Sequence, residues 1–332
     1  MGIKFGVIGC GNIIRRAMGR AFQEAPGADL TAVMDTNPAK AEETAARYGA
    51  QKTYGGLDDL LADEEIEAVY VAVPVHLHKE VTLEASAAGK HVLCEKPMAM
   101  DVAECLSMIQ ACRKAKVKLM IGFMMRFHPC HRKAREMIQN GELGRIVLVR
   151  AQQSYEYPTD PNAWQQKKEL SGGGALMDAG SHCIDLLRFL TGEDVREVVS
   201  FTDNLAFEYN VEDTATVLMR FKSGTQGVVD ACFSTPDDSV EQRLEIYGTK
   251  GSILGSGTIS PFPKGELVIH VQGRSGPYEY EPADLYVQEI QHFVSCIEED
   301  KEPICSGTDG LKAQEVMSAA YTSAKQNKVI AL

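Results

Sequence analysis

Short apolar stretches alternate with longer amphipathic stretches over residues 3–122. The apolar stretches predict strands at residues 3–8, 30–34, 68–73, 91–94 and 118–122, and the amphipathic stretches predict helices at about 12–24, 39–48, 58–63, 79–88 and 102–115. Strands that alternate with helices of this length are typical of parallel βαβ units. The fold class predicted from this pattern is α/β, with a doubly wound, parallel Rossmann domain over residues 1–122.

The pattern changes after residue 122. A helix is predicted at residues 132–139, and the segments that follow are mostly strands, at 145–154, 195–201, 214–221, 226–233, 243–247 and 267–271. One helix, predicted at residues 175–190, interrupts them. This arrangement predicts a second, α+β domain over residues 123–332, with a large and mainly antiparallel sheet for substrate binding and oligomerisation.

Composition narrows the classes of function. The 332 residues are enough for two domains, and the net charge of −12 argues against nucleic acid or an anionic membrane as a partner. We find no apolar run of membrane-span length and no signal-peptide pattern, so we expect a cytoplasmic protein. The nine cysteines are scattered without metal-ligand spacing, and we expect reduced thiols.

The first predicted strand leads into part of a dinucleotide-binding fingerprint. Gly9 allows a tight turn, and Gly11 allows a pyrophosphate to approach the following helix, but Ile14 stands at the position of the third glycine. Asp35 ends the second strand, where an acidic side chain binds the ribose hydroxyls of NAD. No arginine follows it to bind a 2′-phosphate. The fingerprint therefore predicts NAD as cofactor, with NADP less favoured.

A lysine follows the strand at residues 91–94. Lys96 lies where the carboxyl ends of the strands of a doubly wound sheet form the ligand crevice, and Pro97 restricts the chain immediately after it. The Lys96–Pro97 bond is also of the kind that can be cis. We expect the Lys96 side chain to face a ligand.

The helix predicted at residues 175–190 carries further polar groups. Asp178, His182 and Asp185 are spaced at i, i+4 and i+7, so an α-helix would place them on one face. The run Gly172–Gly174 precedes the helix, and we interpret these glycines as letting the backbone come close to a bound molecule. Gly192 is the expected end of the helix.

These side chains suit the oxidation of a secondary alcohol by hydride transfer. His182 is the candidate base for the hydroxyl proton, and Lys96 would stabilise charge on the same oxygen. Asp178 would orient the imidazole or bind a neighbouring hydroxyl. Arg126, Tyr155 and Tyr157 are candidate substrate contacts, because they combine a fixed hydrogen-bond donor with aromatic rings, as small-molecule sites commonly do.

A set of motifs along the chain resembles the Gfo/Idh/MocA family of oxidoreductases. The motifs are Gly9-x-Gly11, Asp35, Val73-Pro74 with His78, Glu95-Lys96-Pro97, Arg126-Phe127-x-Pro129, Gly172-Gly173-Gly174-x-x-x-Asp178-x-Gly180-x-His182, and Tyr247-Gly248-x-x-Gly251. The resemblance implies NAD(P)-linked oxidation or reduction of sugars, inositols or related polyols. It also implies a C-terminal sheet that forms an oligomer interface, and hence a homodimer or homotetramer.

The resemblance assigns Lys96, Asp178 and His182 to catalysis, and it places Glu95, Trp164 and Tyr286 near the cofactor. The full set of expected cofactor contacts is Gly9, Gly11, Asn12, Ile13, Asp35, Val73, Pro74, His76, His78, Glu95, Lys96, Trp164 and Tyr286. No metal is expected, because the spacing of His76, His78, His128 and His131 fits no closed zinc site. The sequence departs from the family at Ile14, Val75 and Met124–Met125.

Two alternative functions stay open at this level. Some members of the family use a tightly held NAD to oxidise a glycoside transiently while they cleave or epimerise it, and the same residues would serve that chemistry. Other members are non-catalytic regulators that bind dinucleotide, but those usually lose the catalytic lysine or histidine, and Lys96 and His182 are both present here.

Overall fold

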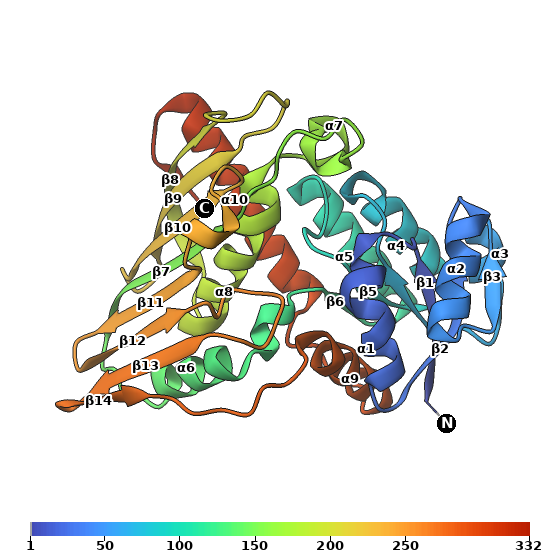
Figure 1. The fold of residues 1–332 in the computed structure, drawn as a ribbon, viewed down its shortest axis with the longest axis horizontal. Helices are drawn as coiled ribbons and strands as arrows, with labels where there is room; N and C mark the ends of the chain where they lie inside the picture. The colour runs from blue at the N-terminus through green and yellow to red at the C-terminus, as the bar shows by residue number, and fades with distance from the viewer. Residues whose placement is uncertain (1) are drawn as a thin grey trace. The chain divides into compact units, whose positions relative to one another are not determined.

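The computed structural model describes residues 2–332. The contacts of the chain divide it into two compact units, each built around its own sheet (Figure 1). The first unit comprises residues 2–123 and Asp284–Leu311, and the second comprises Met124–Ala283 and Lys312–Leu332.

The sheet of the first unit is entirely parallel. Its strands are β1 (Ile3–Ile8), β2 (Ala28–Met34), β3 (Lys52–Tyr54), β4 (Ala68–Val71), β5 (His91–Cys94) and β6 (Leu119–Ile121). They follow the order β3-β2-β1-β4-β5-β6, so the direction of winding reverses between β1 and β4. Ligands of doubly wound sheets bind at this reversal, outside the carboxyl ends of the strands. The predicted Rossmann domain is confirmed.

The helices of the first unit connect these strands. They are the π-helical turn η1 (Ile14–Met18), α1 (Gly19–Glu24), α2 (Pro38–Tyr48), α3 (Leu57–Leu61), the 3₁₀ turn η2 (Val75–Leu77), α4 (His78–Ala87) and α5 (Val102–Ala115). Two have side-chain caps at their first turn. Asn37 accepts a hydrogen bond from the Ala39 N–H at 3.1 Å, and Asp101 accepts one from the Glu104 N–H at 2.9 Å.

Helix α9 (Leu285–Glu298) also packs in the first unit. The sequence pattern predicted a second domain from residue 123 to the end of the chain, so the return of this segment to the first unit differs from that prediction. The physical reason is an apolar face on α9: Phe293 is fully buried, and its ring centre lies 6.2 Å from that of Phe5 on β1. Contacts between residues so distant in the sequence leave no local pattern.

The second unit contains a nine-stranded sheet. Its strands are β7 (Ile146–Ser154), β8 (Val195–Asp203), β9 (Thr214–Phe221), β10 (Gln226–Cys232), β11 (Arg243–Gly248), β12 (Gly251–Ser256), β13 (Glu266–Val271), β14 (Arg274–Pro277) and β15 (Ile330–Ala331). The order is β14-β13-β12-β11-β7-β10-β9-β8-β15, and every pair is antiparallel except β7 with β10. The expected large, mainly antiparallel sheet is therefore present.

Helices cover one face of this sheet. The helical segments that begin in the second unit are η3 (Met124–Phe127), α6 (Pro129–Gln139), η4 (Trp164–Gln166), α7 (Lys168–Ser171), η5 (Leu176–Gly180), α8 (Ser181–Thr191) and η6 (Asp237–Ser239), and α10 (Gly307–Gln326) enters from the first unit. Helices α6, α8 and the later part of α10 lie on the same side of the strands (Figure 1). None of the helices within residues 2–332 is both long and apolar enough to cross a bilayer.

The two faces of the sheet differ in burial, as alternation along the strands requires. Val149, Val229 and Leu244 point to the helices and are fully buried. On the opposite face, Phe201 is 69% exposed and Leu218 is 48% exposed. The sheet thus has one packed face and one open face that carries large apolar side chains.

Candidate active site

The turn after β1 contains the two glycines of the predicted fingerprint. Gly9 has φ of +96°, and a Cβ atom on it would lie 2.7 Å from the carbonyl oxygen of Ala72, so glycine is required there. A Cβ atom on Gly11, in contrast, would meet nothing within 4 Å. This open side, at the start of a helical stretch, fits the approach of a pyrophosphate to backbone N–H groups.

Asp35 lies beside this turn. One of its carboxylate oxygens accepts a hydrogen bond from the Cys10 N–H at 2.9 Å, and the other accepts one from the Asn37 N–H, also at 2.9 Å. The two bonds hold the carboxylate at the end of β2, next to the glycine turn. Each oxygen keeps a lone pair, so the group can still accept hydrogen bonds from ribose hydroxyls.

The helix after the glycine turn begins as a π-helical turn, which the sequence analysis did not predict. Tyr48 shapes it: its hydroxyl donates to the Arg15 carbonyl at 3.2 Å, and its ring lies against Gly19, where a Cβ atom would be only 2.4 Å away. Ile14, at the third position of the fingerprint, is buried in this turn. Asn12 is exposed and accepts a hydrogen bond from Arg15 at 2.5 Å.

His78 occupies a buried position between two segments of the candidate site. Its Nδ1 lies 3.0 Å from the Pro97 carbonyl oxygen, and its Nε2 lies 2.9 Å from the Val73 carbonyl oxygen. Both ring nitrogens are thus directed at the protein, so His78 joins the end of β4 to the segment after Lys96 rather than offering a nitrogen to a cofactor. Burial lowers its pKa. The expected contacts Val73, Pro74 and His76 are half-buried.

The segment after β5 contains Glu95 and Lys96, and the Lys96–Pro97 bond is cis. Glu95 is held on both oxygens: Oε1 accepts from the Tyr70 hydroxyl at 2.5 Å, and Oε2 accepts from the Lys96 N–H at 3.2 Å. It also lies over Gly122, where a Cβ atom would be 3.2 Å from Oε1. The half-buried Lys96 therefore follows a residue that is fixed within the first unit.

Two residues of α9 belong to the electrostatic surroundings of Glu95. Tyr286, an expected cofactor contact, is 7% exposed, and burial together with the charge of Glu95 raises its pKa. Glu289 is fully buried, and burial, reinforced by Glu95, raises its pKa well above the usual value. Neither Glu289 oxygen has a hydrogen-bond partner within residues 2–332. No motif or spacing in the sequence marks Glu289 as part of this site.

The segment η5–α8 carries Asp178 and His182. Between Gly173 and Leu187, Asp178 is the one residue that is not buried, and His182 is 6% exposed. The hydroxyl of Tyr155 donates to Asp178 Oδ2 at 2.6 Å, and the Tyr155 ring packs on Phe233 with centres 5.1 Å apart. Tyr155, expected to contact substrate, is thus a direct partner of Asp178.

The glycines ahead of this segment have a different role from the one expected. A Cβ atom on Gly173 would lie 1.9 Å from the Tyr321 hydroxyl, and one on Gly174 would lie 1.9 Å from the Glu212 carbonyl oxygen. The close approach that requires glycine is therefore to the protein's own residues. The first turn is also π-helical, so the i, i+4, i+7 face predicted for Asp178, His182 and Asp185 does not continue through it.

Asp185 and Arg126 form a buried ion pair. Arg126 Nε and Nη2 donate to the two Asp185 oxygens at 2.8 Å and 2.5 Å, and the guanidinium lies 5.1 Å from the centre of the Phe189 ring. Arg126 is 3% exposed, so this geometry ties η3 to α8. Among the other expected contacts, Tyr157 donates to Gln165 at 3.1 Å, and Trp164 is half-buried in η4.

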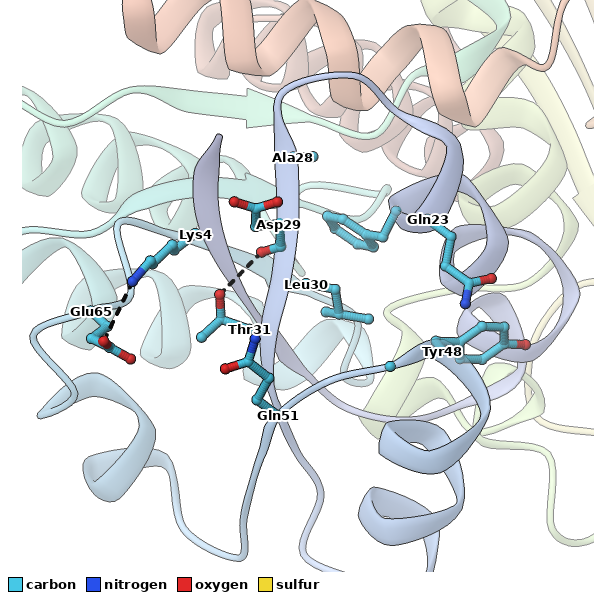
Figure 2. A pocket seen from close by; sticks show the side chains of 11 residues that line it. Lys4, Gln23, Ala28, Asp29, Leu30, Thr31, Tyr48, Gln51 and Glu65 are labelled. Atoms are coloured by element: carbon cyan, nitrogen blue, oxygen red, sulfur yellow. Dashed lines mark hydrogen bonds and ion pairs between the residues drawn. The ribbon is translucent and has the colours of Figure 1, made fainter. Parts of the chain in front are cut away.

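A polar pocket of about 480 Å³ lies elsewhere in the first unit (Figure 2). Lys4 and Glu65 lie on one side of β2, with Gln23 and Tyr48 on the other. Lys4 Nζ is 3.4 Å from Glu65, and Thr31 donates to the Asp29 carbonyl. None of the residues that line this pocket is a predicted site residue.

Comparison with known proteins identifies the family. Residues 3–123 match the model of the oxidoreductase family with an NAD-binding Rossmann fold, and residues 131–254 match the GFO/IDH/MocA C-terminal domain. The chain therefore belongs to the Gfo/Idh/MocA family, as its motifs predicted. It is an oxidoreductase, and its first unit is an NAD(P)-binding Rossmann domain.

Individual relatives cover nearly the whole chain. A 1,5-anhydro-D-fructose reductase from Ensifer adhaerens is 31% identical over 93% of this chain and 92% of its own length. The crystal structure of an aldose-aldose oxidoreductase from Caulobacter crescentus, complexed with glycerol, has a TM-score of 0.92 at 30% identity and covers 100% of both chains. A levoglucosan dehydrogenase complexed with NADH has a TM-score of 0.90 at 26% identity, covering 100% of this chain and 99% of its own.

Proposed function

We propose that the protein is a dehydrogenase or reductase that interconverts a secondary alcohol and a ketone on a sugar, inositol or related polyol. The observation that carries the proposal lies in η5 and α8: between Gly173 and Leu187, Asp178 is the one residue that is not buried, and His182 follows four residues later. The names of the relatives, a reductase and dehydrogenases of sugars, support the same class of substrate.

In this proposal, Lys96, Asp178 and His182 act on one carbinol group. The bound dinucleotide supplies a ring that accepts or returns a hydride. His182 removes the hydroxyl proton during oxidation and returns it during reduction, and Lys96 donates a hydrogen bond to the oxygen that becomes the carbonyl. Asp178, held by Tyr155 at 2.6 Å, orients the imidazole or a neighbouring hydroxyl.

NAD is the proposed cofactor. The Asp35 carboxylate is fixed beside the glycine turn by two backbone N–H groups, so its negative charge cannot move away from an incoming ligand. A ribose diol can donate hydrogen bonds to it, whereas the 2′-phosphate of NADP would be repelled. Thr36 and Asn37 add no positive charge beside it.

The open face of the nine-stranded sheet is the proposed oligomer interface. Phe201 and Leu218 are among the most exposed large apolar side chains of the second unit, and both lie on this face. Burying such a patch against a second copy would remove apolar surface from water. We therefore expect a homodimer or homotetramer. Light scattering of the purified protein measures the oligomeric state.

The test of the function is the formation or consumption of NADH with a panel of inositols, aldoses, anhydro sugars and glycosides, with NADP in parallel. Lys96→Met removes the proposed hydrogen-bond donor and keeps the length of the side chain. We expect kcat/KM to fall at least about 100-fold on whichever substrate turns over, as for loss of a donor to a developing oxyanion.

Lys114→Met is the matched control, because Lys114 is exposed on α5 in the same unit. It should leave turnover unchanged. Unchanged turnover in Lys96→Met would contradict the assigned role of Lys96. Consumption of a glycoside without net NADH would instead show a redox-neutral enzyme, and binding of dinucleotide with no turnover at all would indicate a regulator.

A further inference from the structure

One buried residue, Glu212, accepts the backbone hydrogen bonds at the start of the helix that contains Asp178 and His182. The Glu212 carboxylate accepts hydrogen bonds from the Gly174 N–H, at 3.0 Å to each oxygen, and from the Leu176 N–H at 2.9 Å. The Glu212 main-chain oxygen accepts the Ala175 N–H at 2.9 Å. Three successive N–H groups of the first turn therefore end on a single residue.

Tyr321 on α10 completes this arrangement. Its hydroxyl donates to Glu212 Oε1 at 2.8 Å. Glu212 is 8% exposed, so the carboxylate has left water and depends on these donors for compensation. The N-terminus of a helix also favours a negative charge. Burial raises the pKa of Glu212, whereas its hydrogen bonds with Leu176, Tyr321 and Gly174 act in the opposite direction.

The glycines fit this arrangement closely. Any side chain on Gly173 would collide with Tyr321, and any side chain on Gly174 would collide with the main chain of Glu212, in both cases at 1.9 Å. An ordinary N-cap is a residue of the adjacent turn. Here the capping group lies 38 residues from Gly174, just before β9, so it fixes the helix end to the sheet.

The π-helical turn η5 follows directly and contains Asp178. π-helical turns are rare and short, and they are less favoured than α-helix. Relaxation of η5 to regular α-helix would change the phase of the turn by one residue, or about 100° around the helix axis. Asp178 and His182 would then change direction relative to each other. A helix end that is held on three N–H groups resists that change.

We propose that Glu212 and Tyr321 are positioning residues for the reaction, which fix the phase of η5 and hence the directions of Asp178 and His182. The inference rests on the proposed function for its kinetic consequences. Its structural content, that these two residues control the surroundings of His182, does not depend on any substrate.

The test uses Glu212→Gln and Tyr321→Phe in the full chain. Glu212→Gln keeps the shape but loses one acceptor and the charge, and Tyr321→Phe removes a single hydroxyl. We expect kcat to fall about 10- to 100-fold in Glu212→Gln and about 3- to 10-fold in Tyr321→Phe, with KM for the dinucleotide unchanged. The pH profile of kcat should also shift, because the base has a new environment.

Ser323→Ala is the matched control. Ser323 is fully buried on α10, and its hydroxyl oxygen accepts the Ser200 N–H at 3.1 Å, so its loss weakens the packing of α10 on β8 without touching Glu212. This variant should lose stability, as the two test variants do, but keep the kcat and pH profile of the wild type. Thermal melts identify any variant that does not fold, and Tyr321→Phe is mild enough to keep the comparison available.

A second readout separates this inference from the proposed function. The ring resonances of His182 in histidine-labelled protein should shift in Glu212→Gln and Tyr321→Phe but not in Ser323→Ala, whether or not any substrate is turned over. If the wild type turns over nothing while these resonances shift, the proposed function fails and the positioning role stands. Wild-type resonances and wild-type kinetics in both variants would overturn the inference and leave a purely structural role.

Discussion

At the scale of single residues, the candidate site consists of polar groups that are held by other groups. Lys96 follows Glu95, which Tyr70 and the Lys96 N–H fix on both oxygens. Asp178 is held by Tyr155. Such second contacts restrict the direction of a reacting side chain, and proximity effects on rate depend on that restriction. These contacts also give a role to residues that lie outside the sequence motifs.

Tyr155→Phe tests the restriction on Asp178. The change removes the hydroxyl that donates at 2.6 Å and keeps the ring on Phe233. We expect kcat/KM to fall about 10-fold, because a hydrogen bond to a charged group is lost, and stability to fall by about 1 kcal/mol. Steady-state kinetics and chemical denaturation measure the two effects.

Tyr209→Phe serves as its control, since Tyr209 packs against the same apolar cluster and its hydroxyl points to the Tyr157 carbonyl, at 3.5 Å. Equal losses of activity in the two variants would show that the loss in Tyr155→Phe does not come from the hydrogen bond to Asp178.

At the scale of elements, two turns that look alike in sequence contain glycine for different physical reasons. Gly11 is open on its Cβ side, whereas Gly174 is pressed against the Glu212 main chain. The absence of a side chain leaves open space beside Gly11, whereas at Gly174 it allows the Glu212 main chain to come close. Position in a motif therefore does not reveal which partner a glycine approaches.

Gly11→Ala and Gly174→Ala should separate these origins. In Gly11→Ala we expect stability within about 0.5 kcal/mol of the wild type and at least a 10-fold weaker affinity for dinucleotide, because the new methyl group occupies the open side of the turn. In Gly174→Ala we expect a loss of about 3 kcal/mol or more, because the collision is with backbone.

Calorimetric titration with NAD and thermal melts measure both variants. A stable Gly174→Ala protein would contradict the packing described for Glu212, and undiminished dinucleotide binding by Gly11→Ala would remove that turn from the cofactor site.

Much of the fold was predictable from local patterns, and each exception has a physical reason. Five of the six strands and the α-helices of residues 3–122 follow apolar periodicity, and their parallel arrangement follows from the alternation of strands and helices. The strand β3, with the sequence Lys-Thr-Tyr, was not predicted because it has no apolar pattern. Strand β12 was not predicted because its glycines and serines leave little apolar pattern. The π-helical turns were not predicted, because the one residue that such a turn adds to a helix leaves no mark in the pattern of apolar residues.

The residues of the candidate site likewise fall into those that local motifs mark and those that only distant contacts identify. Gly9, Asp35, Lys96, Asp178 and His182 lie in short motifs, so the sequence alone marks them as candidates. Glu212 and Tyr321 were not, because their partners are far away in the chain; the adjacent acids Glu212 and Asp213, just before a strand, were the one available signal. His78 and Arg126 were also predicted as ligand contacts, but local sequence does not reveal that His78 contacts the Pro97 carbonyl and that Arg126 is paired with Asp185.

At the scale of the whole molecule, pH links the candidate site to stability through Glu289. A glutamate in an unfolded chain releases its proton near the ordinary pKa of 4.5, whereas the folded protein retains it because burial raises the pKa of Glu289. Above pH 4.5 the folded state therefore binds more protons than the unfolded state. Stability falls as pH rises from 4.5 toward the raised pKa, and this contribution is fully present only below 4.5.

Glu289→Gln removes the ionisation and keeps the shape. We expect the variant to be more stable than the wild type at pH 8, by at most about 5 kcal/mol, and nearly equal to it at pH 5, since each pH unit above 4.5 costs at most about 1.4 kcal/mol. Urea denaturation at the two pH values measures the difference. Glu298→Gln, an exposed change on the same helix, controls for loss of charge. A gain that is the same at pH 5 and pH 8 would mean that Glu289 is not the group that retains the proton.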